Sequence, residues 1–385
     1  MRSPYFTEEH QRFRAHVRAF LTEEVAPGAD TWERERGLPR ALWKSLGEQG
    51  LLGLLHPRAA GGGEHDLFTS VVFLEELGRM GYGGLRAAVS VHAYMATHYL
   101  AAAGGRALQD AYLAPAVRGE RVAALALTEP GAGSDLSGLT TCAERDGDHF
   151  VLRGTKTMVS NGMAADFHVV AVRTAPEASG ARAGTTGLSL FVVDAALPGV
   201  GATPLETLGW RAAGTATVVY DDVRVPAGRI IGRRDSGFYY LMRGLQLERL
   251  VAAVLALGEA DRLLADIRRW VSGRELFGGA LARLQAPLHR IADLATELEA
   301  ARQLVHHTAW CYQRGELPAT ECSMAKLYTT ELACRMADAN LHLQGAHGYL
   351  DGADAARAHR DTRAATIAAG PSEVMRDIIG RSLTR

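Results

Sequence analysis

Apolar side chains recur at helical spacing through roughly the first 118 residues of the chain. Side chains that repeat every three to four residues lie on one face of a helix. Glycines at 61–63 and around 81–84 interrupt the pattern, so it predicts several separate helices. The repeating positions are Phe13, Val17, Phe20 and Leu21, then Leu42, Leu46, Leu51 and Leu52, and then Val72, Leu74, Leu77 and Met80.

From about Val122 the pattern changes to alternating positions and short β-branched runs. Such runs predict strands of an antiparallel sheet, here at residues 149–152, 168–172, 188–193 and 217–220. The segment 175–186 is rich in Gly, Ala and Ser and predicts an exposed loop between two strands. After Pro226 the helical period returns, with long stretches beginning at Gly237, Leu284 and Ala319. The chain therefore predicts an α+β fold in the order helical, β, helical.

Composition and charge exclude several classes of protein. Of the 385 residues 47% are apolar, which is enough for sizeable cores. Lys and Arg total 42 against 43 Asp and Glu, so no overall field favours nucleic acid or an anionic membrane. No apolar run approaches the roughly 20 residues of a membrane helix, and the N-terminus lacks the apolar core of a signal peptide.

The four cysteines, Cys142, Cys311, Cys322 and Cys334, are scattered along the chain. They lack the close pairs of a zinc site or a redox motif. We therefore expect a cytoplasmic protein with reduced thiols and no metal site.

Turn-forming residues are densest at 128–135, where the sequence is TEPGAGSD. Pro130 fixes one φ angle, and Gly131 and Gly133 permit conformations and close approaches that a β-carbon blocks. Ser134 adds a hydroxyl. On these features alone an ordinary surface turn and a cofactor-holding loop are both possible.

The string TEPGAGSD, together with KTMVSNG at 156–162, closely resembles the flavin-contacting segments of the acyl-CoA dehydrogenase family. Further matches are GWR at 209–211, DVRVP at 222–226, and RELFG at 274–278 followed by Gln285. The resemblance spans nearly the whole chain. It implies an N-terminal helical domain at 1–120, an antiparallel β domain at 121–232 and a C-terminal four-helix bundle at 233–385.

The resemblance also implies bound FAD. Leu127 and Thr128 are expected along the polar edge of the flavin ring, and Ser160 offers a hydroxyl toward N5. Met158 stands where family members usually carry Trp or Phe, and it can cover the apolar face of the ring. The other expected cofactor contacts are Ser134, Arg274, Phe277, Gln285, His342, Gly345, Ala346, Pro371 and Glu373.

Two of these contacts imply an oligomer. In the family, residues at the positions of Arg274 and Gln285 reach the adenine and pyrophosphate end of a flavin bound mainly to a neighbouring subunit. A homo-oligomer is therefore expected, with a tetramer favoured over a dimer.

The implied reaction removes the α proton and the β hydride of an acyl thioester, and the hydride passes to flavin N5. It needs one carboxylate base. Many members carry that base in a segment such as IYEGTSEIMR, which here reads IAAGPSEVMR and has Ala369 at the base position. In the family the backbone N–H at this position helps to hold the substrate carbonyl, and Ala369 keeps that N–H.

Other branches, including the isovaleryl and long-chain types, carry the base on a bundle helix in a string such as LxxER, which LQLER at 245–249 matches here. We therefore expect Glu248 to be the base. Burial in an apolar stripe would raise its pKa, as suits a general base; the alternative is a glutamate paired with an arginine on a helix face. Helical spacing sets Glu248 beside Leu241, Leu245, Val251 and Leu255.

The substrate carrier stays open at this point. Gln246 stands where coenzyme A users often have Asp, and coenzyme A and carrier proteins share the pantetheine arm. An acyl-CoA is expected, with an acyl- or aminoacyl-carrier-protein thioester as the alternative, and an electron-transferring flavoprotein or oxygen accepts the electrons. The expected substrate contacts are Ser134, Gln246, Arg249, Ala369 and Gly370.

Two further alternatives differ in class. A flavin monooxygenase on the same scaffold typically lacks a glutamate at both base positions, so Glu248 argues against it. A scaffold protein that retains only the oligomeric bundle would bind no flavin and would be colourless.

Overall fold

The first part of the chain is helical, as its apolar repeat predicts. The structure is a computed structural model that describes residues 3–174, 184, 186–316 and 318–384. Short π-helical segments at Leu21–Val25, Val91–Ala96 and Gln109–Leu113 make neighbouring helices nearly continuous. The helices are α1 (Glu8–Phe20), α2 (Ala26–Glu35), α3 (Arg40–Glu48), α4 (Leu67–Arg79), α5 (Gly83–Ser90), α6 (Thr97–Ala103), α7 (Arg106–Leu108) and α8 (Ala114–Val117).

The middle of the chain forms one sheet with the strand order β6-β7-β3-β2-β4-β5-β8, and β1 pairs with β4. Most pairings are antiparallel as predicted, but β1 and β2 each pair with β4 in parallel. The predicted loop at 175–186 lies almost wholly outside the described residues. The strands are β1 (Ala123–Ala126), β2 (Cys142–Asp146), β3 (His149–Val159), β4 (Phe167–Arg173), β5 (Leu188–Asp194), β6 (Val200–Pro204), β7 (Ala216–Pro226) and β8 (Ile230–Ile231).

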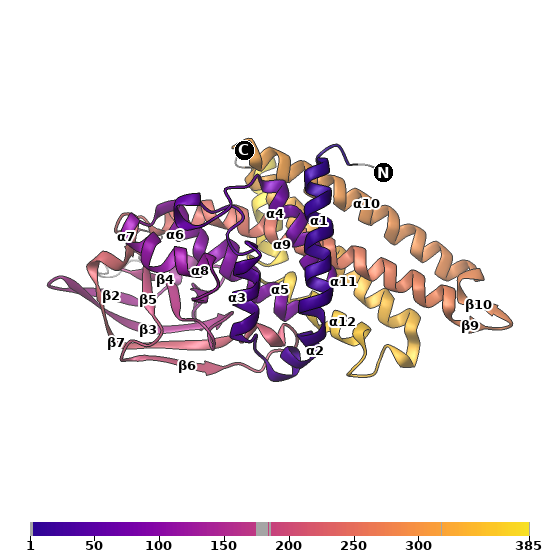
Figure 1. The fold of residues 1–385 in the computed structure, drawn as a ribbon, viewed down its shortest axis with the longest axis horizontal. Coiled ribbons are helices and arrows are strands. Elements are labelled where there is room, and N and C mark those ends of the chain that lie inside the picture. The colour runs from indigo at the N-terminus through magenta and orange to yellow at the C-terminus, as the bar shows by residue number, and fades with distance from the viewer. Residues whose placement is uncertain (1–2, 175–183, 185, 317, 385) are drawn as a thin grey trace.

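The last part of the chain is again helical, and its long helices extend beyond the rest of the molecule. The hairpin between the first two of these helices lies at the opposite end of the long axis from the sheet (Figure 1). This architecture confirms the predicted α+β class and its order of helical, β and helical parts. The elements are α9 (Gly237–Gly273), the hairpin of β9 (Glu275–Leu276) and β10 (Gly279–Ala280), α10 (Gln285–Gln313), α11 (Ala319–Gln344), α12 (Asp354–Ala365) and α13 (Ser372–Leu383).

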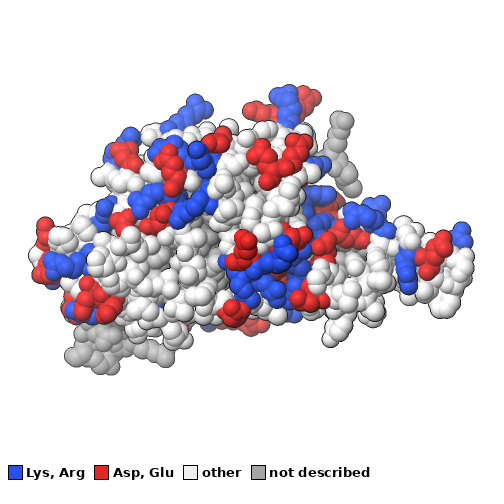
Figure 2. All heavy atoms as spheres, turned by 60° about the horizontal axis from the view of Figure 1, so that its bottom comes forward, with Lys and Arg blue, Asp and Glu red and all other residues white. Residues whose placement is uncertain are grey.

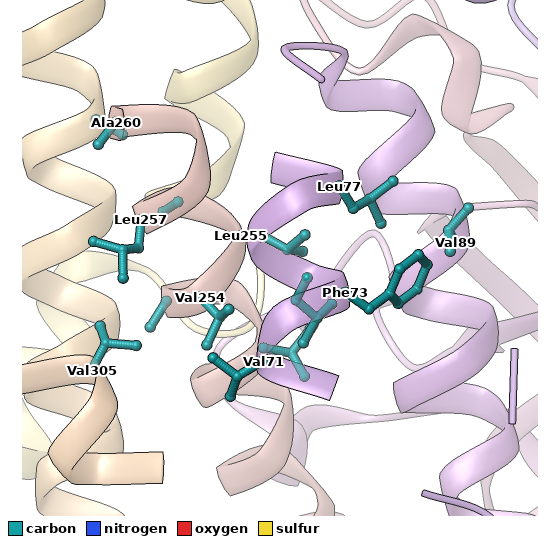
Figure 3. Packing of buried hydrophobic residues seen from close by; sticks show 14 of the residues in the cluster. Val71, Phe73, Leu77, Val89, Val254, Leu255, Leu257, Ala260 and Val305 are labelled. Atoms are coloured by element: carbon teal, nitrogen blue, oxygen red, sulfur yellow. The ribbon is translucent and has the colours of Figure 1, made fainter. Parts of the chain in front are cut away.

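The two helical parts share one hydrophobic core, centred where α4 packs against α9 (Figure 3). A β-carbon added to Gly78 would lie 2.3 Å from the Leu255 carbonyl oxygen, and one added to Gly258 would lie 2.2 Å from the Glu75 carbonyl oxygen. The two backbones therefore touch, because glycine removes the side chain from both sides of the crossing. Phe73, fully buried on α4, points away from α9 toward Val89 on α5, so α4 is packed on both sides (Figure 3). The position of α9, which carries the predicted base, is thus fixed by the N-terminal helices.

The surface carries charges of both signs. On the face that Figure 2 shows, acidic and basic side chains are interleaved between large uncharged areas. No helix within the described residues is long and apolar enough to span a membrane. All four cysteines are free thiols.

Candidate active site

The two motifs that carry the resemblance lie side by side in the structure. The segment after β1 runs along the end of β3, where the Thr157 N–H donates to the Thr128 carbonyl oxygen at 2.8 Å. The Lys156 ammonium donates to the Leu127 carbonyl oxygen at 3.0 Å. Leu127 and Thr128, which were expected along the polar edge of the flavin, are therefore held by direct hydrogen bonds to the second motif.

A buried ion pair fixes this arrangement. Glu129 Oε1 lies 2.8 Å from Lys156 Nζ, with both side chains almost inaccessible to solvent. Burial alone would raise the pKa of Glu129, but Lys156 and hydrogen bonds from Thr140 and Thr141 lower it to about 2. Burial lowers the pKa of Lys156 to about 8 against the opposing effect of Glu129. Both groups are charged at neutral pH, so their ion pair holds the turn that begins at Thr128 against β3.

A bulge at the end of β3 turns Met158 outward. The register with β7 shifts between Lys156 and Val159, and Met158 has a left-handed φ of 55° with 63% of its surface exposed. Such a conformation is uncommon for a residue with a β-carbon and is frequent at sites that hold ligands. The next turn is anchored by the Asn161 side-chain amide, which donates to the Ala88 and Ala123 carbonyl oxygens at 2.9 and 3.1 Å.

The groups at this end of the sheet fit a flavin in their chemistry. Thr128 and Ser160 are half-buried hydroxyls, Ser134 is exposed, and Met158 supplies an apolar cover. A β-carbon at Gly131 would meet no atom of the described residues within 4 Å, so these residues leave the loop backbone open to a ligand. A flavin needs such donors along its edge and apolar contact on its face.

Glu248 lies on α9 with 4% of its surface exposed. The Tyr99 hydroxyl, from α6, donates to Glu248 Oε1 at 2.7 Å. Burial raises the pKa of Glu248, while the Tyr99 hydrogen bond and the charge of Arg249 act in the opposite direction. The predicted burial and the predicted direction of the pKa shift are confirmed; Tyr99 was not predicted, because it lies 149 residues away in the sequence.

Gln246 and Arg249, which flank Glu248 in the chain, and Lys326, which lies close to Arg249, are wholly or partly buried. Arg249 Nε and Gln246 Oε1 are buried atoms without a hydrogen-bond partner among the described residues. Lys326 on α11 is fully buried and close enough to Arg249 for their charges to interact. Burial, assisted by Arg249, lowers the pKa of Lys326 to about 8. Buried polar atoms without partners are rare in folded proteins and mark places where a ligand can bind.

Lys326 connects this cluster to the turn at 367–371. Its ammonium donates to the Gly370 carbonyl oxygen at 2.7 Å. Ala369 and Gly370 have left-handed φ angles of 55° and 97°, a conformation that costs an alanine about 1–2 kcal/mol. The Ala369 N–H has no hydrogen-bond acceptor among the described residues, so the strained turn presents a free backbone donor. Pro371 is half-buried in the same turn, and Glu373 is exposed just beyond it.

The remaining predicted cofactor residues lie elsewhere. Arg274 and Gln285 are exposed on either side of the β9–β10 hairpin, where Phe277 is 91% exposed. A cleft of about 680 Å³ lies at this end and is lined by Arg274 and His347 among others. His342, Gly345 and Ala346 are exposed at the nearby end of α11. Because this end is remote from the sheet (Figure 1), one chain does not bring the two groups of residues together.

A larger cavity, about 1010 Å³, contains none of the predicted site residues. It lies between α1, α4, α9 and α10, and its charged side chains are largely paired with one another, as Arg14 is with Glu75 and Glu76 at 2.7 and 2.9 Å. Among the described residues no group of three or more His, Cys, Asp or Glu is placed to hold a metal ion.

Comparison with protein families matches three consecutive parts of the chain. Residues 7–120 match the N-terminal domain model of acyl-CoA dehydrogenases, residues 124–223 the middle domain and residues 235–384 the C-terminal domain. The chain is 34% identical to the mitochondrial long-chain specific acyl-CoA dehydrogenase of Sus scrofa over 379 residues, 98% of this chain and 87% of that protein.

Solved structures agree. The fold is similar to an acyl-CoA dehydrogenase from Geobacillus kaustophilus, with a TM-score of 0.95 and 37% identity over 100% of both chains. It is also similar to the prolyl acyl carrier protein oxidase AnaB, with a TM-score of 0.91 and 27% identity over 99% of this chain and 100% of that one.

Proposed function

Because the chain belongs to the acyl-CoA dehydrogenase family and is an FAD-dependent oxidoreductase, we propose that it catalyses α,β-dehydrogenation of an acyl-CoA thioester. Glu248 takes the α proton in this proposal. Bound FAD supplies the acceptor for the β hydride. The observation that carries the proposal is a buried carboxylate with a raised pKa on the helix where one branch of the family is expected to carry its base.

The neighbouring groups support this role. Glu248 Oε2 has no hydrogen bond among the described residues, so this oxygen is free to accept a proton. The unbonded Ala369 N–H is suited to the thioester carbonyl, on which negative charge develops as the α proton leaves. A donor fixed before the reaction requires no reorganisation. The rest of the FAD-binding set stays as proposed from the sequence: Leu127, Thr128, Met158 and Ser160 at the ring, Ser134 as a contact to cofactor and substrate, and Pro371 and Glu373 beside the turn.

Anaerobic mixing of the purified protein with a panel of acyl-CoA thioesters tests the reaction class. We expect at least one of them to bleach the oxidised flavin absorbance in a single turnover. A protein that dithionite bleaches but that no thioester bleaches would contradict the proposal.

A carrier-protein thioester is the second candidate. Two observations favour it: the similarity to a carrier-protein oxidase, and Gln246, whose buried Oε1 has no hydrogen-bond partner among the described residues. The same panel should therefore include acyl- and prolyl-carrier-protein thioesters. Bleaching by these and not by the CoA series would replace the first candidate, and the rate of reoxidation in air would separate an oxidase from an enzyme that uses an electron-transferring flavoprotein.

We further propose a cytoplasmic homotetramer in which each FAD is shared between two subunits. Arg274, Phe277, Gln285, His342, Gly345 and Ala346 would contact the flavin of a neighbour. The separation of the β9–β10 hairpin from the sheet along the long axis of one chain supports this arrangement (Figure 1). So does the exposed apolar surface of Leu276, Phe277, Leu284 and Leu288 at the hairpin end.

Replacing Arg274 with Ala should weaken FAD binding by about 10- to 100-fold, because a hydrogen-bonded charge partner of the pyrophosphate is lost. Flavin content and the FAD dissociation constant measure this effect. Arg268→Ala is a matched control, an exposed arginine in the last part of α9, the helix that ends one residue before Arg274.

Co-expression tests the sharing itself. In mixed oligomers of Arg274→Ala and Glu248→Gln subunits, a shared site can combine an intact Glu248 from one chain with an intact Arg274 from the other. Activity above that of either parent is therefore expected. Mixed oligomers as inactive as both parents would place Arg274 in the site of its own chain.

Replacing Lys326 with Met should slow flavin bleaching by about tenfold while FAD stays bound. The substitution removes the hydrogen bond to Gly370 that holds the turn, and an oxyanion donor that is removed outright costs about 10²–10³-fold. Rapid-mixing kinetics measure the rate. An unchanged rate with an unchanged substrate affinity would show that the turn holds its shape without Lys326.

A further inference from the structure

Tyr99 and Glu248 form a buried contact between two helices that are distant in the sequence. The Tyr99 ring, from α6, lies across Gly244, one turn before Glu248 on α9. A β-carbon at Gly244 would lie 2.5 Å from the Tyr99 hydroxyl oxygen. Glycine at this position therefore lets the phenol reach the carboxylate, to which it donates at 2.7 Å.

The hydrogen bond makes the two carboxylate oxygens different. Oε1 accepts the hydrogen bond from the Tyr99 hydroxyl, and Oε2 has no hydrogen bond among the described residues. We propose that Tyr99 is a positioning residue for Glu248, which holds the carboxylate through Oε1 and so leaves Oε2 as the atom that accepts the α proton. This inference rests on the proposed role of Glu248 as the base.

The proton balance of the step agrees with this assignment. The Cα–H bond breaks, its proton forms an O–H bond with Oε2, and the phenol keeps its own proton throughout. Burial, together with the negative charge of Glu248 and the hydrogen bond to it, raises the pKa of Tyr99 well above its ordinary value. Tyr99 therefore donates a hydrogen bond to the carboxylate before transfer and to the carboxylic acid after it.

The other groups around Glu248 keep a fixed charge between about pH 5 and 7. His98 on α6 is neutral because burial lowers its pKa to about 4. Burial raises the pKa of Tyr312 on α10 and of Cys322 on α11 to about 12. Lys326, with a pKa of about 8, stays protonated in this range, and Arg249 beside Glu248 keeps its charge. A pH profile in this window therefore reports on Glu248.

The test is Tyr99→Phe, measured as the rate of anaerobic flavin bleaching by saturating thioester against pH. A hydrogen bond to the charged form lowers the pKa of a carboxylate, so its loss should move the midpoint upward by about one to two pH units. The limiting rate should fall by about tenfold, because the carboxylate is no longer held. The substrate dissociation constant should stay the same, which a general loss of structure would not allow.

Tyr112→Phe is the matched control. Tyr112 is also a buried phenol that donates to a carboxylate, Asp194, in the same hydrophobic cluster, but it does not contact Glu248. Its removal should leave the midpoint unchanged. A midpoint shift of the same size in both variants would overturn the inference.

Gly244→Ala gives a second route if Tyr99→Phe does not fold. It keeps both functional groups, and the added methyl displaces the far end of the phenol rather than the backbone. The midpoint should again move upward.

Glu248→Gln in the same assay tests the role of Glu248 as the base separately from the role of Tyr99 in positioning it. If this variant no longer bleaches but Tyr99→Phe has a wild-type midpoint and rate, Glu248 remains the base and the role of Tyr99 is wrong. If Glu248→Gln bleaches normally, both assignments fail.

Discussion

Glu248→Gln should give a protein that keeps its yellow FAD but is bleached by substrate about 10³-fold more slowly than the wild type. The substitution preserves shape, and the amide oxygen can still accept the Tyr99 hydrogen bond. What is lost is proton acceptance, and a positioned general base contributes about 10²–10⁴-fold. Stopped-flow absorbance under anaerobic conditions measures the rate.

In the wild type, the dependence of the bleaching rate on pH should show the titration of Glu248. A base works in its ionised form, so bleaching should rise with pH as Glu248 loses its proton and should fall as pH drops through its pKa. Because burial raises that pKa, the midpoint should lie above the ordinary value for a glutamate. The Gln variant has no carboxyl to titrate and should lack this limb.

Two controls show whether the slow bleaching of Glu248→Gln comes from the lost base alone. Dithionite should bleach Glu248→Gln fully, which shows that the flavin is intact, and the variant should bind the thioester with wild-type affinity. A variant that substrate bleaches at a near-normal rate would remove Glu248 from the mechanism and leave the chain without an assigned base.

The helices and central strands of the fold follow from sequence pattern because burial is periodic in them. α9 begins at Gly237, where the helical repeat resumes, and β4 and β5 coincide with apolar runs that the sheet buries on both faces. The pattern fails where this cause is absent. β6 is an edge strand with mostly exposed residues, and β1 consists of three alanines and a leucine, so neither has a strand's composition.

The site divides in the same way. Glu248, Thr128 and Ser160 could be predicted as site residues because a local motif carries them, whereas Tyr99 and Lys326 come close to them only in the folded chain. Nothing in a helical repeat distinguishes the tyrosine whose hydroxyl meets a carboxylate from one that merely packs. Lys326 has the spacing of an ordinary helix-face lysine, yet the structure buries it completely. The domain boundaries at 120/121 and 232/233 stay predictions.

The ion pair of Glu129 and Lys156 could have been predicted from the sequence, because the two motifs of the predicted flavin pocket carry these opposite charges. Glu129→Gln should destabilise the protein by about 3–5 kcal/mol, because it leaves the Lys156 charge buried without a partner. It should also release FAD, since Glu129 ties the loop that carries Thr128 to β3 and to Thr140 and Thr141. Thermal unfolding and flavin content after gel filtration measure the two effects.

Glu144→Gln is the control for this experiment. Glu144, on β2, pairs at 2.8 Å with Arg153, which lies on β3 as Lys156 does. Both side chains of this pair are exposed, and such pairs contribute at most about 1 kcal/mol. The control should therefore keep its flavin and nearly all its stability. Equal losses in both variants would show that the sheet is sensitive to any charge removal and that burial of the Glu129 pair is not the cause.

Acid provides an independent test of the same pair. Glu129 has a folded pKa of about 2 against an ordinary value of 4.5, so the unfolded chain binds more protons between these values. The stabilisation from Glu129 is fully present above about pH 4.5 and is lost as pH falls toward 2. In Glu129→Gln this component should be absent. The double variant Glu129→Gln with Lys156→Met should regain part of the lost stability, because no unpaired charge remains buried. It should still bind FAD weakly, because the Glu129–Lys156 ion pair that holds the loop against β3 is absent.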